Sequence, residues 1–465
     1  MSKRTVHIKS FGCQMNKLDT ALVSSALQQA DYVLTDNVKE ADVVLINTCS
    51  VRDHAEQRVF SHLGQLKHLK KNRPEVIVGI MGCMAQRLGE TLLEHEAVDL
   101  VCGPAQIPHI VDLCETLHAE RSKQLDVTEH IRAQQVDNPD LEAFETIHDS
   151  DDKTIPGQAF VRIMRGCNNF CTYCIVPYVR GPEVSRSPEV ILEQVRKLSD
   201  QGVKQITLLG QTVNAYRYDT GSKTLCLADL LAAVSEISGI EWIRFVTSYP
   251  TPEFFTPIMQ AMAHLPKVCS YLHLPAQSGS DRILKAMNRH YTAQEYLDLL
   301  AQARDIVPDL AVAGDFIVGF PGETDDDFEQ TAALVRQALY KNCFVFKYSP
   351  RPGTTSDRRL EDNIPTEIKQ QRNVALLAVQ ETISQKLSQD FVGRTVTVLV
   401  EGPSKKPHLN AAENKNFPQL VGRTATDWIV VFNGPQSLAG QLADVTIEKA
   451  NPLTLFGQPL AQPSR

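Results

Sequence analysis

The first third of the chain alternates between short apolar runs and longer segments with helical spacing. Thr5–Gly12, Asp42–Asn47 and Glu75–Ile80 have the length and composition of buried strands, and the segments after them repeat apolar residues every three or four positions. The first of these helices is expected over Asn16–Gln29. Alternating strands and helices predict a doubly wound parallel sheet, which we assign to a domain covering residues 1–145.

Six further strand-like segments, with helical patterns between them, predict a partial (β/α)6 barrel in residues 153–385. The expected strands are Ala159–Ile163, Gln205–Leu209, Trp242–Thr247, Val268–Leu274, Leu310–Phe320 and Cys343–Tyr348. Before this domain, residues 120–157 are polar and show little periodicity. We interpret them as a linker or docking loop.

The last part of the chain predicts a third, smaller domain. After a long helical stretch at Thr366–Gln389, the pattern changes to short β-rich runs separated by Gly and Pro. These runs are Thr395–Glu401, Val421–Thr424, Trp428–Phe432 and Ala443–Ile447. They predict a small β-barrel in residues 388–455, a fold that often binds single-stranded nucleic acid. The chain as a whole is therefore expected to be of the α/β class, with this barrel at its end.

Composition adds limits on class and compartment. With 465 residues, 43% of them hydrophobic, the chain is long enough for two or three domains. Its net charge of −8 argues against a general nucleic-acid coat protein, although it leaves room for a local basic patch. No apolar run approaches the ~20 residues of a membrane span, and the start shows no signal-peptide core, so we expect a cytoplasmic protein. Its eleven cysteines should then be reduced thiols, whose grouping indicates metal or redox chemistry.

Three cysteines stand close together on one loop, directly after the first strand of the expected barrel. We call Cys167, Cys171 and Cys174 the barrel cysteines. Each can bind one iron of a 4Fe-4S cluster, whereas clusters used only for electron transfer normally have a fourth cysteine. The fourth iron would stay open for a substrate or cofactor, which indicates chemistry rather than structure. Zinc is the alternative, but zinc sites favour a second ligand pair, and none follows Cys174 at such spacing.

A second set of cysteines follows the strands of the first domain. Cys13, Cys49 and Cys83, the sheet cysteines, each stand just past the carboxyl end of an expected strand. In an open α/β sheet these ends line one crevice, so the sequence predicts a second three-cysteine metal site. Cysteine is also a common buried residue, which explains one such placement more easily than three. Cys102 lies within its own strand-like segment, so we interpret it as a packing residue.

Polar, glycine-rich segments follow the other strands of the second domain, at the end where (β/α) barrels place their chemistry. They would ring one cavity. The candidate residues in them are Gln211, Asn214, Ser248 and Gln277. Nearby, Arg282, Lys285 and Arg289 are interpreted as a solvated helix face. His273 is interpreted as a strand histidine with satisfied hydrogen bonds.

The barrel cysteines, with Tyr173 just before the last of them, resemble the signature of the radical S-adenosylmethionine superfamily. In that family the open iron binds the amino and carboxylate groups of S-adenosylmethionine. An electron from the cluster then splits this molecule into methionine and a 5′-deoxyadenosyl radical. The residue that matches Tyr173 usually lies against the adenine.

Longer motifs resemble one family, the methylthiotransferases, across nearly the whole chain. This family has an N-terminal three-cysteine domain, a radical S-adenosylmethionine core and a C-terminal RNA-binding barrel called TRAM. The matching motifs are Ser10–Asn16, Ile46–Cys49, Met81–Gln86, His273–Met287 and Gly319–Thr324. Within the family, the residues around Cys13 and Cys83 are most similar to the tRNA-modifying branch that acts on isopentenyladenosine. Thr212 and Tyr249 depart from the family pattern, where we expect Asn and His.

This resemblance implies a reaction and a set of partners. The barrel cysteines would hold the radical-generating cluster, and the sheet cysteines would hold an auxiliary 4Fe-4S cluster that delivers sulfur. The residues that would line the S-adenosylmethionine site are Tyr173, Gln211, Asn214, Ser248 and Gln277. The product would be 2-methylthio-N6-isopentenyladenosine beside the anticodon, with one S-adenosylmethionine used as methyl donor and another as radical source. The implied partners of this monomer are the tRNA anticodon stem-loop, an electron donor such as flavodoxin or ferredoxin, and a sulfur source.

Other functions fit parts of the same pattern. Two alternatives of the same class are methylthiolation of threonylcarbamoyladenosine in tRNA and of an aspartate in a ribosomal protein. A different class is an iron-sulfur redox sensor that binds RNA through the terminal barrel and has no S-adenosylmethionine site. Reductive formation of 5′-deoxyadenosine by the purified protein separates the enzyme from the sensor.

Overall fold

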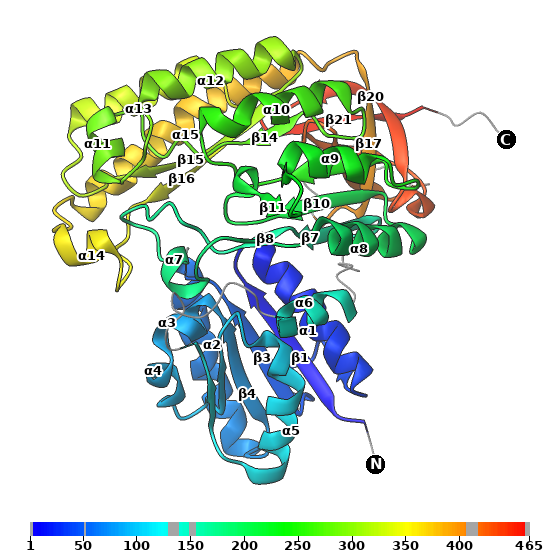
Figure 1. Cartoon of the computed structure of the whole chain (residues 1–465), viewed down its shortest axis with the longest axis vertical. Helices are drawn as coiled ribbons and strands as arrows, with labels where there is room; N and C mark the ends of the chain where they lie inside the picture. Colours follow the sequence, from blue (N-terminus) through cyan, green and yellow to red (C-terminus); the bar gives the residue numbers. More distant parts are fainter. Residues whose placement is uncertain (1–2, 51–52, 129–138, 148–154, 406–416, 461–465) are drawn as a thin grey trace.

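The structure is a computed structural model that describes residues 3–50, 53–128, 139–147, 155–405 and 417–460. The N-terminal domain lies at one end of the molecule, and the second domain lies at the other with the C-terminal barrel beside it (Figure 1). Among the described helices, none is both long and apolar enough to cross a membrane.

Six parallel strands form the N-terminal sheet, in the order β2-β1-β3-β4-β5-β6. Their bounds are β1 Thr5–Phe11, β2 Val33–Leu34, β3 Val43–Thr48, β4 Ile77–Gly82, β5 Leu100–Cys102 and β6 Gln124–Asp126. One face carries the helices α1 (Gln14–Gln29) and α5 (Ile110–Glu120) over an apolar core. The other face carries the helices α2 (Asp53–Asn72), α3 (Cys83–Leu88) and α4 (Glu90–Leu93) over a second core. The strand order reverses between β1 and β3, so the predicted doubly wound sheet is confirmed.

The interpretation of residues 120–157 as a linker or docking loop is wrong in part, because this range contains a strand and a helix. β6 falls within it and adds the sixth strand, and α6 (Pro139–Ile147) also lies in this range. β6 is a three-residue edge strand, too short for a periodic signal. α6 is fixed partly by ion pairs from Glu142 and Glu145 to arginines of the second domain, which apolar spacing does not reveal. Residues 129–138 and 148–154 of the predicted loop lie outside the described residues.

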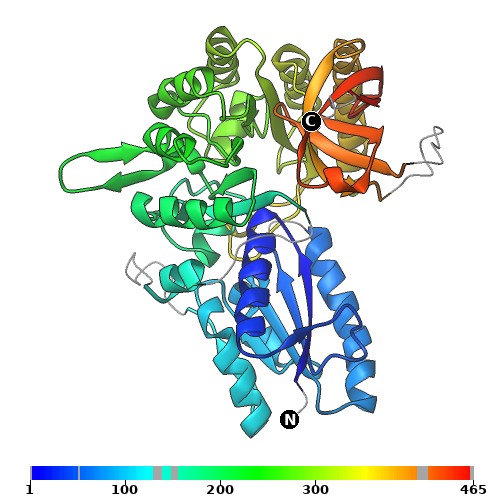
Figure 2. The same ribbon diagram turned by 90° about the vertical axis from the view of Figure 1, so that its right-hand side faces the viewer.

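The second domain is a partial barrel of six parallel strands. Its two sheets, β7-β10-β13 and β14-β15-β16, are joined by a bridge between Ile243 and Val268. The strands are β7 Gln158–Arg162, β10 Gln205–Leu209, β13 Trp242–Phe245, β14 Tyr271–His273, β15 Ala311–Val318 and β16 Asn342–Lys347. The helices outside them are α8 Pro188–Asp200, α9 Leu227–Ser235, α10 Pro252–His264, α12 Ala293–Ile306, α13 Asp325–Ala338 and α15 Thr366–Gln389. A hairpin of β11 (Arg217–Asp219) and β12 (Thr224–Cys226), absent from the sequence prediction, projects from this domain (Figure 2).

The C-terminal domain is a closed barrel in the order β17-β18-β19-β21-β20. Its strands are β17 Thr395–Pro403, β18 Gln419–Thr424, β19 Ile429–Asn433, β20 Leu442–Ala450 and β21 Thr454–Pro459. The predicted small barrel is thus confirmed, although β21, which contains Gly457 and ends at Pro459, was missed. The barrel docks on the second domain through buried cations: Arg244 donates to the Thr424 carbonyl, and Lys341 Nζ lies 3.0 Å from an Asp427 carboxylate oxygen.

Candidate metal centre and cofactor pocket

The barrel cysteines lie on the loop between β8 (Met164–Arg165) and α7 (Val176–Val179). Gly166 begins the loop with a φ of +69°, and a Cβ there would come within 1.8 Å of the Pro182 carbonyl oxygen, so only glycine fits. The far side of the loop is held by Thr172, whose N–H and hydroxyl donate to the Met287 and Ala286 carbonyls. This frame fixes the thiols at the carboxyl end of the barrel strands, as the sequence predicts.

Cys167 and Cys171 are buried and Cys174 is partly buried, and hydrogen-bond donors lie beside the first two sulfurs. Burial is the main cause that raises the pKa of Cys174, and the neighbouring Cys171 and Cys167 raise it further. Asn169 Nδ2 lies 3.4 Å from the Cys167 sulfur. The Thr212 hydroxyl lies at the same distance from that sulfur. Hydrogen bonds of this kind stabilise metal-bound thiolates and tune cluster potential, so these residues suit an anionic sulfur site.

Arg289 contradicts its sequence interpretation as a solvated cation. Its Nη1 lies 3.3 Å from the Cys171 sulfur, and its Nη2 donates to the Pro275 carbonyl at 3.0 Å. Its guanidinium lies 4.3 Å from the ring centroid of Tyr249 and 5.1 Å from that of Tyr291. The side chain is therefore part of the site. It was missed because its partner sulfur is 118 residues away in the sequence.

Among the described residues, no three His, Cys, Asp or Glu side chains converge as ligands of a single metal ion would. A cubane cluster does not require such convergence, because each thiolate binds a different iron. All three ligands would be thiols, two of them buried and one partly buried, and hydrogen-bond donors lie beside the Cys167 and Cys171 sulfurs. These residues therefore fit an iron-sulfur cluster better than a mononuclear zinc site.

The five candidate cofactor residues separate into different roles. The Gln211 Oε1 and Ser248 Oγ atoms are buried and have no hydrogen-bond partner within the described part of the chain. An unpartnered buried polar atom costs about 1–3 kcal/mol, which a bound polar ligand would recover. Asn214 differs, because its amide is saturated by the backbone of Tyr249, to which it donates at 2.7 Å and from which it accepts at 2.8 Å. Tyr173 packs on the cluster of Met287, Phe320 and their neighbours, and so forms an apolar wall.

Backbone strain also gathers around this pocket. Gln277, the fifth candidate, has a φ of +71°, and Thr247, just before Ser248, has a φ of +72°. Phe170 in the cysteine loop and Asn288 beside Arg289 are left-handed too, with φ of +48° and +57°. Left-handed conformations of residues other than glycine cost free energy and tend to cluster where a ligand is held. His273, on the neighbouring strand, is paired to Asp315 at 3.1 Å.

The sheet cysteines follow β1, β3 and β4, the central strands at the switch point. Cys13 is the N-cap of α1, and its thiol donates to the Asn16 side chain at 3.3 Å. A hydrogen bond with Cys49 is the largest cause that lowers the pKa of Cys13 to about 6, and the charge of Arg180 adds to it. Burial is the main cause that raises the pKa of Cys83, the first residue of α3, and the charge of the nearby Cys13 also raises it. The structure therefore brings the three thiols together, while Cys102 is buried inside β5.

Both cysteine sets lie at the boundary between the first two domains. Cys83 packs against Ile175 and Val179, immediately after the last barrel cysteine. Arg180 links the domains, because its Nε lies 3.2 Å from the Cys83 sulfur and its Nη2 lies 3.1 Å from a carboxylate oxygen of Asp19. Sequence reasoning missed Arg180, because neither partner is near it in the chain.

The comparisons with known proteins agree with this arrangement. Residues 161–335 match the Radical SAM superfamily, residues 5–103 match Uncharacterized protein family UPF0004, and residues 389–460 match the TRAM domain. A solved radical S-adenosylmethionine methyltransferase from Kitasatospora setae, with cobalamin and a 4Fe-4S cluster bound, has a similar fold. Its TM-score is 0.52 at 12% identity, over 76% of this chain and 77% of that one. Fold and matches together define a radical S-adenosylmethionine enzyme.

Sequence relatives narrow this class. A tRNA-2-methylthio-N(6)-dimethylallyladenosine synthase from Rhodopirellula baltica is 43% identical over 458 residues, which cover 98% of this chain and 95% of the relative. A synthase of the same name from Chromobacterium violaceum is 43% identical over 464 residues, covering 99% and 100%. The chain belongs to this family of synthases, and the predicted methylthiotransferase family is confirmed.

Proposed function

We propose that this protein transfers a methylthio group to carbon 2 of N6-isopentenyladenosine, next to the anticodon of tRNA. The names of the relatives and the TRAM match support the reaction and the RNA substrate. The single structural observation that carries the proposal is the packing of Cys83 against Ile175 and Val179, directly after Cys174. A sulfur-delivering site and a radical-generating site must act on one base, so their ligands have to come from neighbouring elements.

Two 4Fe-4S clusters and S-adenosylmethionine are the cofactors of this activity. The barrel cysteines would hold one cluster and the sheet cysteines the other. Cluster and S-adenosylmethionine supply radical chemistry for the unactivated C–H bond at carbon 2, which no side-chain acid or base can break usefully.

The chain's own residues bind and orient these groups. Asn169, Thr212 and Arg289 provide hydrogen-bond donors to the barrel sulfurs, which stabilises their deprotonated form. Gln211 Oε1 can accept from an amino group or a ribose hydroxyl, and Ser248 Oγ can donate or accept. Both polar atoms are already buried, so their desolvation does not have to occur when the cofactor binds.

The remaining partners follow from the reaction. The target base lies in a loop, where it can leave the stack without opening a duplex. Radical formation needs an electron donor such as flavodoxin or ferredoxin, and sulfur consumed at each turnover needs a source. We place the reaction in the cytoplasm and assign it to a monomer.

The deciding experiment is mass spectrometry of nucleosides from total tRNA of cells that lack the protein, compared with complemented cells. We expect the methylthio nucleoside to vanish and isopentenyladenosine to accumulate. An unchanged methylthio-isopentenyladenosine level would overturn the assignment, and altered threonylcarbamoyladenosine or ribosomal-protein modification would then identify the substrate.

The cysteine assignments are tested in the purified protein. Cys174→Ala should abolish reductive formation of 5′-deoxyadenosine, because only three ligands hold that cluster. Replacing all three sheet cysteines by alanine should remove about half of the iron and leave that activity in place. Unchanged iron content would refute the second site.

A further inference from the structure

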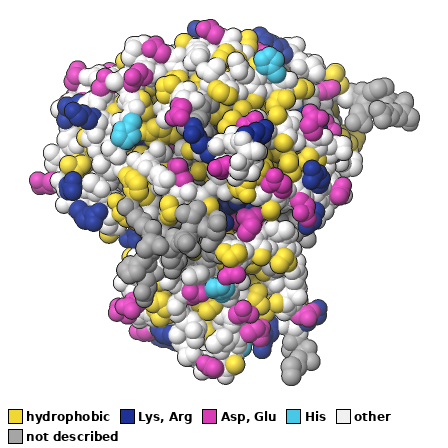
Figure 3. Space-filling model, viewed as in Figure 1, with side chains coloured by type: hydrophobic (Ala, Val, Ile, Leu, Met, Phe, Trp, Pro, Cys, Tyr) yellow, Lys and Arg dark blue, Asp and Glu magenta, His cyan; other side chains and the backbone are white. Residues whose placement is uncertain are grey.

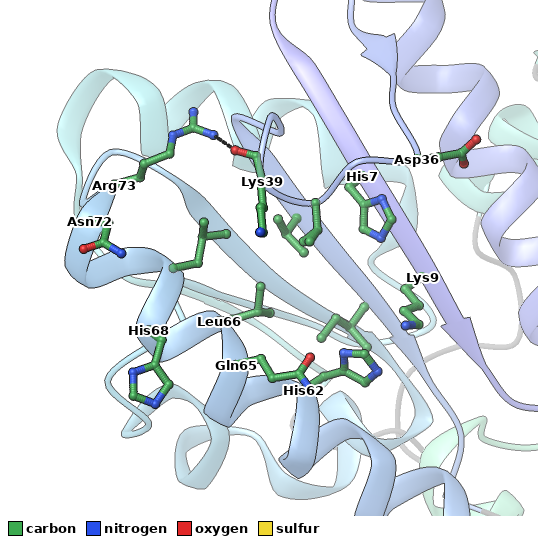
Figure 4. A pocket seen from close by; sticks show the side chains of 14 residues that line it. His7, Lys9, Asp36, Lys39, His62, Gln65, Leu66, His68, Asn72 and Arg73 are labelled. Carbon is green, nitrogen blue, oxygen red and sulfur yellow. Dashed lines mark hydrogen bonds between the residues drawn. The ribbon is translucent and has the colours of Figure 1, made fainter.

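A cavity of about 680 Å³ lies in the N-terminal domain, on the face of the sheet that carries α2. It opens between β1, the loop before β3, and one side of α2 (Figure 4). Its volume is in the range of cavities that hold small ligands. None of the candidate metal or cofactor residues described above lines it.

The cavity exists because the two faces of β1 differ. Val6 and Ile8 point into the core under α1 and α5. His7 and Lys9 alternate with them and line the cavity on the opposite face. The only described helix that lines the cavity is α2, so the β1 side is left open.

Two lysines in this cavity have no carboxylate partner among the described residues. They are Lys9 on β1 and Lys39 on the loop before β3. Arg73 is not free in this way, because it donates to the Lys39 carbonyl at 2.6 Å and pairs with Glu75 at 3.0 Å, and so it fixes the loop that carries Lys39. Asp36, the one acidic lining residue, directs its carboxylate away from the cavity (Figure 4).

The charge of this cavity differs from that of the molecule as a whole. The chain carries a net charge of −8, and acidic and basic side chains are interspersed over the face seen in Figure 3. A cavity lined by two lysines that have no carboxylate partner in the described part of the chain therefore stands out as a place for an anion.

Aliphatic side chains and the ring of His62 make up another part of the cavity lining. Val44, Ile46 and Leu66 form part of the lining. The His62 ring lies 5.2 Å from the Phe11 ring, and burial, aided by the charges of Lys9 and His7, lowers the pKa of His62. A neutral imidazole beside an apolar floor suits a flat heterocycle. Ammonium groups beside a stacking surface are the combination by which proteins hold unpaired nucleotides.

We propose that this cavity binds an unpaired nucleotide and its phosphate in the RNA substrate, away from the base that is modified. β1 ends at Phe11, two residues before Cys13, so Lys9 lies at most about 14 Å from Cys13 even along a fully extended chain. An RNA bound at the sheet cysteines therefore passes near the cavity. This inference rests on the proposed function, since it takes the RNA to be the substrate.

The test compares two double variants of the cluster-loaded, full-length enzyme. Lys9→Ser with Lys39→Ser removes the cavity cations. The control, Lys67→Ser with Lys71→Ser, also removes two cations, both from α2, but these two do not line the cavity. They lie near Glu96, and Lys67 Nζ is 2.8 Å from its carboxylate. The probe is an anticodon stem-loop RNA that carries isopentenyladenosine. Its dissociation constant is measured over a series of salt concentrations.

The cavity variant should lower the magnitude of the slope of log affinity against log salt by about 1, because one phosphate lies beside the two lysines and a lost phosphate contact removes about 1. It should raise KM more than it lowers kcat. The variant with Lys67→Ser and Lys71→Ser should keep the wild-type slope, and Lys9→Arg with Lys39→Arg should keep it too.

Equal slopes for the two serine variants would overturn the proposal. So would a cavity variant that binds RNA normally but either loses affinity for adenosine 5′-monophosphate or loses reduction by flavodoxin, because the cavity would then serve a free nucleotide or the electron donor. Methylthiolation by the wild-type enzyme is followed in the same samples. If the wild-type enzyme binds the RNA but does not methylthiolate it, the proposed function is contradicted, while the assignment of the cavity to RNA binding still holds.

Discussion

The carboxylate of Asp19 should be a structural clamp between the first two domains, and its replacement by asparagine measures that role. Asp19 lies on α1, and its oxygens pair with Arg162 and, at 3.1 Å, with Arg180 of the second domain. All three side chains are nearly inaccessible to water, with 2%, 2% and 6% exposure. After Asp19→Asn, Arg162 keeps Glu145 at 3.2 Å, while within the described residues the polar partner left to Arg180 is the Cys83 thiol.

The expected loss follows from that geometry. Removing one partner of a buried ion pair costs about 3–5 kcal/mol, because the other charge is left unpaired in a low-dielectric environment. For a domain of this size one kcal/mol corresponds to about 2–4 °C in Tm, so the N-terminal domain should unfold about 6–20 °C earlier. Far-UV circular dichroism or calorimetry of the cluster-free protein measures this transition.

Asp31→Asn is the matched control. Asp31 pairs with Lys3 at 2.9 Å, but those side chains are 82% and 65% exposed. An exposed pair contributes below about 1 kcal/mol, so its Tm should move by less than about 4 °C. Adding Arg180→Met to Asp19→Asn should recover part of the loss, since the unpaired charge is removed with it. A shift for Asp19→Asn no larger than for Asp31→Asn would refute the argument that burial decides the strength of this clamp.

Three further predictions address the cofactor pocket and the domain contacts. Arg289→Lys keeps the charge but loses the paired hydrogen bonds to Cys171 and Pro275. Because hydrogen bonds to the sulfurs help to set the cluster potential, the barrel cluster should have a lower reduction potential in an EPR-monitored titration. An unchanged potential would contradict the role of Arg289 as a donor to the cluster sulfur. Ser248→Ala removes a buried hydroxyl that has no hydrogen-bond partner among the described residues, so the cofactor-free protein should be at least as stable as wild type. The affinity for S-adenosylmethionine, measured by calorimetry, should fall about threefold to tenfold. A loss of stability that accompanies the loss of affinity would indicate a purely structural residue. Burial lowers the pKa of Lys341 to about 8. Between pH 8 and about 10.4 the unfolded chain therefore binds more protons at this group than the folded chain, so the stability of the wild type should rise with pH relative to that of Lys341→Met. Parallel plots of Tm against pH for the two proteins would rule this out.

The local pattern of the sequence was sufficient for the elements that carry the candidate site. Strand-length apolar runs predicted β1, β3 and β4, and the cysteines after them could be placed at one sheet edge because parallel strands share a direction. The barrel cysteines could be grouped because they lie within one loop. Spacing and periodicity determine such features without any knowledge of the rest of the chain.

Contacts between distant segments were decided only by the tertiary structure. Arg289 and Arg180 belong to the site because folding places their guanidinium groups beside the sulfurs of Cys171 and Cys83, which are 118 and 97 residues away. A single arginine has the same local signature whether it is solvated or buried, since its partner, not its neighbours, determines its environment. The same reason applies to β21, which closes the barrel by pairing with β19 and β20. Those hydrogen bonds are made with strands elsewhere in the sequence, so the composition of β21 alone does not predict them.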